Sequence, residues 1–266
     1  MSTACHYPTN ISDEQWSMLQ LLLPKPQWHP GGPGRKPMDL RRVLNGLFSV
    51  TKTGCPWRMM PKDVGHGHTI YGDFRRWRRE GVWACVLDTL RQWARQSQGR
   101  LPAPSACCAD SQSIKTATQG EDVGFEGHKT IKGRKRPSLV DTLGRIVAVV
   151  VTAAKTEERQ GLVALMKRYV ASGVTRLRKI WVDGGDDAQW LCDWIRGLKR
   201  THKVDLEVVE HTGKGFQVVP YRWVVERTFA WLLNDRRHSR DYEVLTASSE
   251  AMLQISMIRL LLKRLA

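Results

Sequence analysis

From about residue 101 onward, short apolar segments of strand length alternate with amphipathic segments of helix length, and this order constrains the fold most. The prediction rests on the spacing of apolar residues, which repeat every two residues in a strand and every 3.6 residues in a helix. The predicted order is strand, two-stranded hairpin with a turn at Asp141–Gly144, helix, strand, helix, strand and two helices: SACCAD, PSLVDTLGRIVAVVVTAA, EERQGLVALMKRYVAS, LRKIWVDGG, DAQWLCDWIRGLKR, DLEVVE, PYRWVVERTFAWLL and TASSEAMLQISMIRLLLKRLA. Such an order predicts an α/β fold in which helices flank a mixed sheet.

The first hundred residues show helical patterns only. Ser12 followed by Gln15 is a capping-box pattern that begins one helix, and a Pro/Gly-rich loop follows it. Further helices are predicted in DLRRVLNGLFSVTKTG, TIYGDFRRWRREG and VWACVLDTLRQWARQS. The polar, Pro-rich SQGRLPAPSA is a predicted linker. We therefore predict an all-α N-terminal domain over residues 1–100 and an α/β domain over residues 101–266.

Two of these N-terminal helices are separated by Gly81, and the first carries four arginines: Arg75, Arg76, Arg78 and Arg79. Two helices joined by a tight glycine turn suit a helix-turn-helix-like DNA-binding module. The alternative is a basic helix that is simply solvated on the surface of a small bundle. Charge alone does not separate these two interpretations.

The formal net charge of the chain is +16 and its sequence pI is about 9.9. Such an excess favours an anionic polymer as partner, and it is divided between both halves of the chain. No apolar run is long enough to span a membrane, and the first residues lack the apolar core of a signal peptide. None of the six cysteines forms a C-x-x-C pair, which favours buried free thiols in a reducing cytoplasm.

Three acidic residues stand out against this pattern. Asp110 and Asp183 end predicted core strands, and Glu226 lies among apolar residues of a predicted helix. Three converging carboxylates repel one another unless a divalent cation neutralises them, and Mg²⁺ prefers such oxygen ligands. Each acid also has an ordinary explanation: either Asp can cap a turn, and Glu226 can pair with Arg222 at i−4. Together with the basic charge, the set points to phosphodiester chemistry.

At these residues the sequence resembles bacterial insertion-sequence transposases of the DDE class, specifically the insertion-sequence-five group. The resemblance covers roughly residues 10–266 and rests on these stretches: GCPWRMMPKD, TIYGDFRRWRREGVW, DSQSIKT, KGRKR, LVDTLG, RKIWVDGG, WVVERTFAWL and SRDYE. It implies a ribonuclease-H-like catalytic fold and an Asp-Asp-Glu site made by Asp110, Asp183 and Glu226. The 43 residues from Asp183 to Glu226 leave no room for the large insertion domain of some relatives.

The resemblance further implies an enzyme that uses two Mg²⁺ ions, with Mn²⁺ as a substitute, to cleave element ends and join the 3′-hydroxyl ends to target DNA. The implied partners are the terminal inverted repeats and target DNA, bound by a homodimer or larger assembly in the bacterial nucleoid. Arg222 matches the group's signature, whereas Val219 and Leu233 replace its Tyr and Lys. Asp186 and the stretch 155–160 also depart from the group. Two rival functions stay open: another ribonuclease-H-like nuclease, and a catalytically inactive DNA-binding regulator.

The stretch KGRKR precedes the predicted hairpin and contains four basic residues: Lys132, Arg134, Lys135 and Arg136. We predict that these residues follow the DNA backbone, because an anionic substrate must approach near the sheet. The alternative is a solvated loop. The predicted DNA-binding set is therefore these four residues, the four arginines of the basic helix, and Arg222.

Overall fold

The computed structural model describes residues 7–26, 28–33, 35–117, 119–173, 176–183, 193–194, 197, 204–209 and 222–266, and of residues 183, 208, 209 and 222 it describes the backbone alone. The N-terminal region forms the predicted helices and one short 3₁₀ turn: α1 (Asp13–Leu19), α2 (Leu40–Thr53), η1 (Trp57–Met59), α3 (Gly67–Arg79) and α4 (Val82–Gln96). The capping box of α1 is confirmed, because Ser12 accepts from the Gln15 N–H and Gln15 reaches back to the Ser12 N–H.

Helices α3 and α4 meet at Gly81, which has a left-handed φ of 71°. A residue with a side chain adopts this conformation only at a cost, so glycine allows the chain to reverse here. The indole rings of Trp77 and Trp83 then pack edge to face, with centroids 5.2 Å apart. Both side chains are buried. The turn at Gly81 is thus held by an aromatic contact between the two helices.

The second part of the chain forms a mixed sheet with helices: β1 (Ala106–Lys115), β2 (Gly124–Glu126), β3 (Ile131–Asp141), β4 (Ile146–Val149), β5 (Thr152–Ala153), α5 (Glu158–Ala171), β6 (Lys179–Asp183), β7 (Asp205–Val209), α7 (Arg222–Leu233), η3 (Arg236–His238) and α8 (Thr246–Leu265). The strand order is β2-β3-β1-β6-β7, and β4 and β5 also pair with β3. Strand β1 runs antiparallel to β3 and parallel to β6, and β6 runs parallel to β7. The predicted α/β class is confirmed, and this is a ribonuclease-H-like sheet. The helix predicted in DAQWLCDWIRGLKR falls almost entirely outside the described residues.

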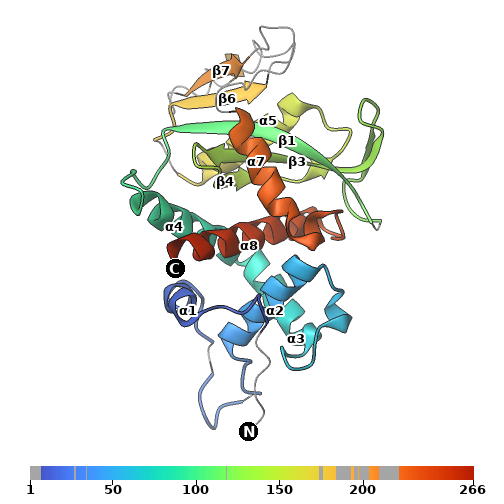
Figure 1. Cartoon of the computed structure of the whole chain (residues 1–266). Helices are drawn as coiled ribbons and strands as arrows, with labels where there is room; N and C mark the ends of the chain where they lie inside the picture. The colour runs from blue at the N-terminus through green and yellow to red at the C-terminus, as the bar shows by residue number, and fades with distance from the viewer. Residues whose placement is uncertain are drawn as a thin grey trace.

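The two faces of the sheet bury different cores because side chains alternate along each strand. Cys107 and Ala109 of β1 belong to a cluster with Leu162 and Leu165 of α5. Cys108 belongs instead to a larger cluster that includes residues of α7 and α8. Helix α5 therefore covers one face of the sheet, and α7 covers the other (Figure 1).

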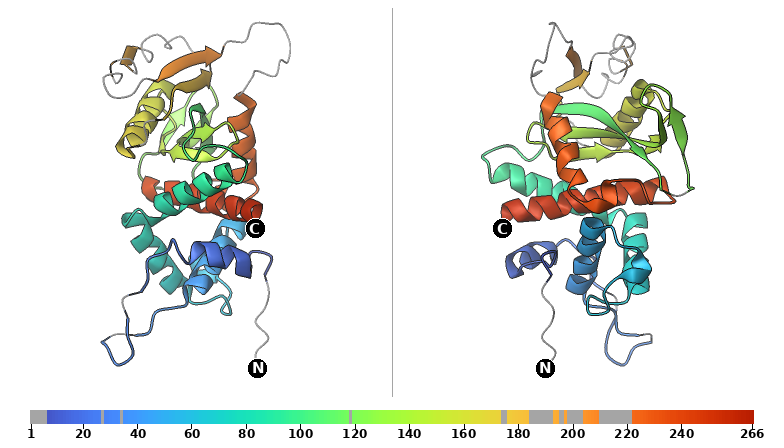
Figure 2. Two further views of the ribbon diagram at one scale, coloured as in Figure 1. Left: turned by 90° about the vertical axis from the view of Figure 1, so that its left-hand side faces the viewer. Right: turned by 45° about the vertical axis from the view of Figure 1, so that its right-hand side comes forward.

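Helix α8 returns from the α/β region and lies against the N-terminal helices (Figures 1 and 2). It packs on α4 and α2, and its residues Met257 and Ile258 share one buried cluster with Leu47 of α2 and Leu90 of α4. The core is consequently continuous across residues 100 and 101. The division into domains at this point stays a prediction, and the structure gives the two parts a common core.

Two smaller predictions concern the cysteines and the membrane. Cys107 and Cys108 are buried free thiols, and burial raises the pKa of Cys108 to about 12. Cys85, however, is exposed, so burial is not common to all the thiols; Cys5 and Cys192 lie outside the described residues. Among the described helices, none is both long and apolar enough to cross a membrane.

Candidate active site

The two predicted aspartates lie on neighbouring, parallel strands of the sheet. In the parallel pair β1–β6, Ala106 lies opposite Lys179 and Cys108 lies opposite Trp181. The paired residues of β1 and β6 end there, and Asp110 of β1 and Asp183, the last residue of β6, each lie two residues further along their strands. Positions 110 and 183 also share the face of Cys108 and Trp181, because each lies two residues further along its strand.

Helix α7 packs on that same face and carries the third acid, Glu226. Its residues Val224, Val225 and Phe229 are buried in the cluster that contains Cys108, and Trp181 packs against this cluster. The helix contacts β1, β3 and β6 (Figure 1). Sheet register and helix packing together assign positions 110, 183 and 226 to one side of the sheet.

The structure corrects two details of these predictions. Asp110 lies in the middle of β1, whereas the sequence predicted a strand end, because the long antiparallel strand β3 pairs with β1 as far as Lys115. Glu226 is exposed, although helical periodicity predicted a carboxylate inside an apolar surface. The buried stripe of α7 is formed by Val224, Val225, Thr228, Phe229 and Leu232, and Trp223 on the side of Glu226 is 45% exposed. Glu226 is therefore an exposed carboxylate, which avoids the large cost of burying a charge.

Asp110 is half-buried and its Oδ1 accepts the backbone N–H of Ser111 at 2.6 Å. This bond orients the carboxylate beside its own strand. Carboxylate oxygens are the donors that Mg²⁺ and Mn²⁺ take, so the chemistry of the three residues fits such an ion. Among the described side chains no group of three possible metal ligands is close enough to form a site, and the Asp183 side chain is outside that set.

The basic stretch before the hairpin is not a loop but part of β3, and three of its four cations are buried. Arg134 is 0% exposed, Lys135 5% and Arg136 2%, whereas Lys132 is exposed. The structure thus contradicts the predicted DNA contact for Arg134, Lys135 and Arg136. Their charges are used inside the fold, and Lys132 alone of the four stays available to a phosphate.

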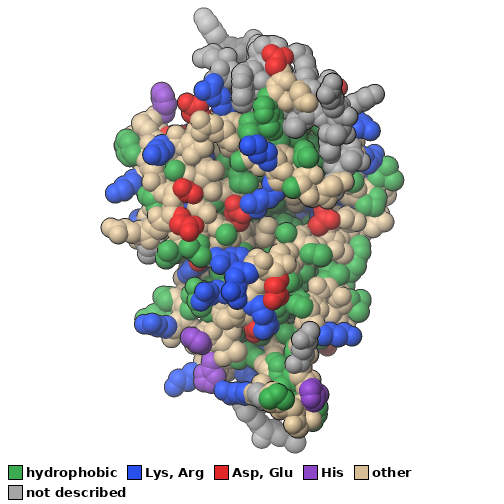
Figure 3. All heavy atoms as spheres, turned by 180° about the vertical axis from the view of Figure 1, so that it is seen from behind, with side chains coloured by type: hydrophobic (Ala, Val, Ile, Leu, Met, Phe, Trp, Pro, Cys, Tyr) green, Lys and Arg blue, Asp and Glu red, His purple; other side chains and the backbone are tan. Residues whose placement is uncertain are grey.

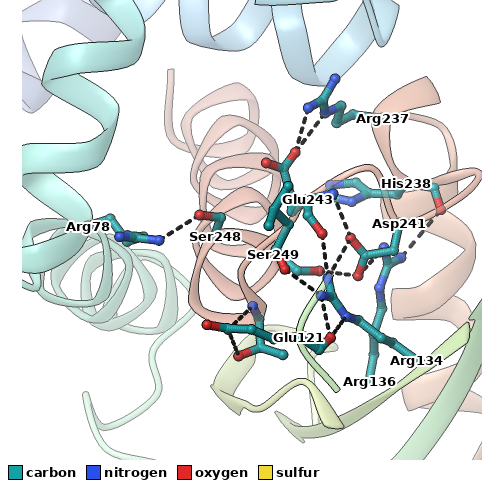
Figure 4. A network of polar contacts seen from close by, with 12 residues as sticks. Arg78, Glu121, Arg134, Arg136, Arg237, His238, Asp241, Glu243, Ser248 and Ser249 are labelled. Atoms are coloured by element: carbon teal, nitrogen blue, oxygen red, sulfur yellow. Dashed lines mark hydrogen bonds and ion pairs between the residues drawn. The ribbon is translucent and has the colours of Figure 1, made fainter. Parts of the chain in front are cut away.

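The partners of the buried arginines lie mainly in the segment that joins α7 to α8, together with Glu121 between β1 and β2 (Figure 4). Arg134 donates to the carbonyl oxygens of Glu121, Glu243 and Val244 at 2.6–2.9 Å, and its Nη1 lies 3.3 Å from Asp241 Oδ1. Asp241 also lies 3.9 Å from Arg136 and accepts from Ser249. The backbone of Asp241 pairs with β1 beyond its end, at Thr116. This network fastens the chain after α7 to the sheet. Asp241 and Glu243 of the network belong to SRDYE, a stretch to which the sequence alone assigned no role.

The arginines of α3 divide into exposed and anchored residues. Arg75, Arg76 and Arg79 are exposed, although Arg76 pairs with Asp73 at 2.6 Å. Arg78 is half-buried and donates to Ser248 Oγ at 2.6 Å, which ties α3 to the start of α8 (Figure 4). Lys and Arg side chains also gather near the middle of the face opposite Figure 1 (Figure 3). The DNA-binding role of α3 stays a prediction, as does that of Arg222, whose side chain is not among those described.

Comparison with known proteins gives a family for each part of the chain. Residues 101–261 match the family model described as "Transposase DDE domain". Residues 11–87 match a model that describes a transposase of the IS4/5 family.

The chain belongs to the DDE transposase family.

A relative agrees with this assignment: the "Insertion element IS402 uncharacterized 16.2 kDa protein" of Burkholderia cepacia is 33% identical over 117 residues, which are 43% of this chain and 78% of the relative. No solved structure matches the chain. Transposases act on DNA, which accounts for the formal net charge of +16 of this family member. The predicted insertion-sequence resemblance is confirmed.

Proposed function

We propose that this DDE transposase cleaves DNA at the ends of an insertion element and joins the freed 3′-hydroxyl ends to target DNA. Asp110, Asp183 and Glu226 would hold the metal ions, Mg²⁺ or in its place Mn²⁺. When bound, two such ions would neutralise the negative charge on the attacking and leaving oxygens. The single observation that supports the proposal best is the parallel pairing of β1 with β6, because Asp110 and Asp183 each follow the pair Cys108–Trp181 by two residues, on the face that the helix of Glu226 covers.

The chemistry consists of two displacements at phosphorus. A water oxygen attacks a phosphodiester at the element end, the bond to the 3′ oxygen breaks, and a 3′-hydroxyl and a 5′-phosphate result. The 3′ oxygen then attacks a target phosphodiester, a new phosphorus–oxygen bond forms, and the target strand's own 3′ oxygen leaves. Protons go to solvent. The chain supplies oriented carboxylates and positive charge, and no side chain becomes covalently attached to DNA.

Several residues of the chain support the binding of an anionic substrate. Exposed cations lie on α3 (Arg75, Arg76 and Arg79) and at the start of β3 (Lys132). Contacts to phosphates from such side chains fix the register of a protein on DNA without reading its sequence. Because two element ends must be brought together, the proposal includes a homodimer or larger assembly on DNA.

The experiment is an in vitro cleavage and strand-transfer assay with Mg²⁺ on the DNA that flanks this coding sequence. Asp110→Asn, Asp183→Asn and Glu226→Gln are compared with Glu158→Gln, a control carboxylate in the first turn of α5 on the opposite face. Each site variant is expected to lose about a hundredfold or more in rate, at least as much as loss of an outer-shell partner of a metal. The control is expected to keep the wild-type rate.

The same assay separates the rival functions. A ribonuclease-H-like nuclease would hydrolyse the DNA without joining the 3′ end to a target. An inactive regulator would bind the flanking DNA without cutting it, and the three substitutions would change nothing. A site variant that cleaves at the wild-type rate removes that residue from the proposed metal site.

A further inference from the structure

Four side chains on α7 and α8 form an alternating stack of indole and guanidinium groups, which we call the Trp–Arg ladder: Trp223, Arg227, Trp231 and Arg264. The guanidinium carbon of Arg227 lies 4.4 Å from the ring centroid of Trp223 and 4.5 Å from that of Trp231. The guanidinium carbon of Arg264 lies 4.1 Å from the centroid of Trp231. These distances are those of cation–π contacts, and they join the two helices.

The ladder rests on the β3–β4 turn. Arg227 Nη2 donates to the Leu143 carbonyl at 3.2 Å, and Thr228 Oγ1 donates to the Gly144 carbonyl at 2.9 Å. The outer members reach solvent, since Trp223 is 45% exposed and Arg264 is also exposed. The ladder is therefore anchored on its inner side and open on its outer side.

No carboxylate among the described side chains forms an ion pair with Arg227 or Arg264. The nearby acid, Asp141, is engaged by Arg95 at 2.6 Å. Burial lowers the pKa of both ladder arginines, and Arg227 lowers the pKa of Arg264 further. The described part of the fold therefore holds two like charges on one indole ring, and Asp141 acts on Arg227 without forming an ion pair with it. Stacking occupies the faces of a guanidinium and leaves its N–H edge for an acceptor in the plane.

From this arrangement we infer that the Trp–Arg ladder binds consecutive phosphates of the DNA backbone next to the catalytic helix. Phosphate oxygens match the planar fork of an arginine, and a stacked guanidinium loses less side-chain freedom when it binds. Arg227 adjoins Glu226 in the helix, so DNA on the ladder passes beside the proposed metal site. The inference thus rests on the proposed function and adds the path of the strand: from Glu226 along α7 towards the C-terminal end of α8.

The test is the salt dependence of binding to a short mixed-sequence DNA duplex, measured by fluorescence anisotropy without divalent metal. Each phosphate contact contributes about 0.9 to the slope of log K against log salt concentration. Arg264→Ala is expected to lower the slope by about 0.9 and to weaken binding about eightfold near 0.1 M salt. Trp231→Leu keeps both charges but removes the ring between them, and is expected to weaken binding in the same direction.

Lys167→Ala is the matched control, because Lys167 is an exposed cation on α5, on the other face of the sheet. Lys167→Ala is expected to leave the salt slope at the wild-type value. Arg264→Lys retains the charge without the planar fork, so its binding affinity should fall between those of wild type and Arg264→Ala. Equal slopes for Arg264→Ala and Lys167→Ala would overturn the inference. Far-ultraviolet circular dichroism of each variant checks that the fold is retained; if Arg264→Ala unfolds, Arg264→Gln is measured instead and decides by the same slope.

Failure of this inference differs from failure of the proposed function. If wild type cleaves and joins DNA while Arg264→Ala binds with an unchanged slope, the ladder proposal alone is wrong. If Arg264→Ala lowers the slope but wild type never cleaves, the ladder binds DNA and the catalytic proposal is wrong.

Discussion

Replacement of Arg134 tests the main correction that the structure makes to the sequence-based prediction. Sequence position predicts that Arg134 and Lys132, two residues apart on β3, both contact DNA. The structure buries Arg134 completely and exposes Lys132. Arg134→Ala should therefore damage folding, and Lys132→Ala should affect only DNA binding.

The expected loss of unfolding free energy in Arg134→Ala follows from the partners of Arg134. Its removal leaves the carbonyl oxygens of Glu121, Glu243 and Val244 without this donor, and it takes one cation from Asp241, which is 1% exposed. An unsatisfied buried group costs about 1–3 kcal/mol, and removing one member of a buried ion pair costs about 3–5 kcal/mol. Arg136 and Ser249 still contact Asp241, so the lower end applies. We expect about 3 kcal/mol, a large share of a typical stability of about 5–15 kcal/mol.

Urea denaturation followed by circular dichroism measures this change, because the free energy of unfolding falls linearly with urea concentration. Lys132→Ala is the matched control: its unfolding free energy should stay within about 0.5 kcal/mol of wild type, while the salt slope of DNA binding falls by about 0.9. Wild-type stability of Arg134→Ala together with a lower salt slope would refute this account, since Arg134 would then be a DNA contact.

Two further predictions concern the β3–β4 turn and a buried histidine. Gly144 has a φ of 80°, and a Cβ there would lie 2.8 Å from both Thr228 Oγ1 and the Trp231 ring. Gly81 has a φ of 71°, but a Cβ there would meet no atom within 4 Å, so Gly144→Ala should lower the unfolding free energy more than Gly81→Ala. Equal losses of unfolding free energy in urea would contradict this steric difference between the two turns. His238 is buried, its Nε2 lies 2.8 Å from Ser256 Oγ, and burial together with Arg136 and Arg237 holds its pKa well below the ordinary value. The unfolded imidazole binds a proton below about pH 6.5, so the unfolded state then holds more protons, and stability should fall with falling pH by about 1.4 kcal/mol per unit until the folded pKa is reached. His238→Gln should remove this part of the slope in urea titrations between about pH 5 and 7; an unchanged slope would assign it to other groups.

Local sequence patterns were sufficient to predict the structure wherever it depends on residues that are neighbours in the sequence. The capping box at Ser12, the glycine turn at Gly81 and the hairpin turn at Asp141–Gly144 depend on residues within a few positions, and the structure has all three. The strands at Asp110 and Asp183 and the helix of Glu226 were also predicted, because hydrophobic periodicity reports which residues must be buried. Which strands are neighbours in the sheet needed the tertiary structure, because the β1–β6 pairing joins positions far apart in the chain.

The sequence by itself determined the α/β class, the order of the main described helices and strands apart from β2, the transposase family and three carboxylates suited to a metal. Only the tertiary structure decided which charges face solvent. Arg134 and Lys132 have the same sign in the same strand, yet Arg134 meets the carbonyls and the carboxylate of a segment about a hundred residues later. A cation is buried only where such partners replace its water, and no local pattern records where the distant partners lie. Arg264 and Trp231 illustrate the converse, since their stacking depends on where two separate helices end.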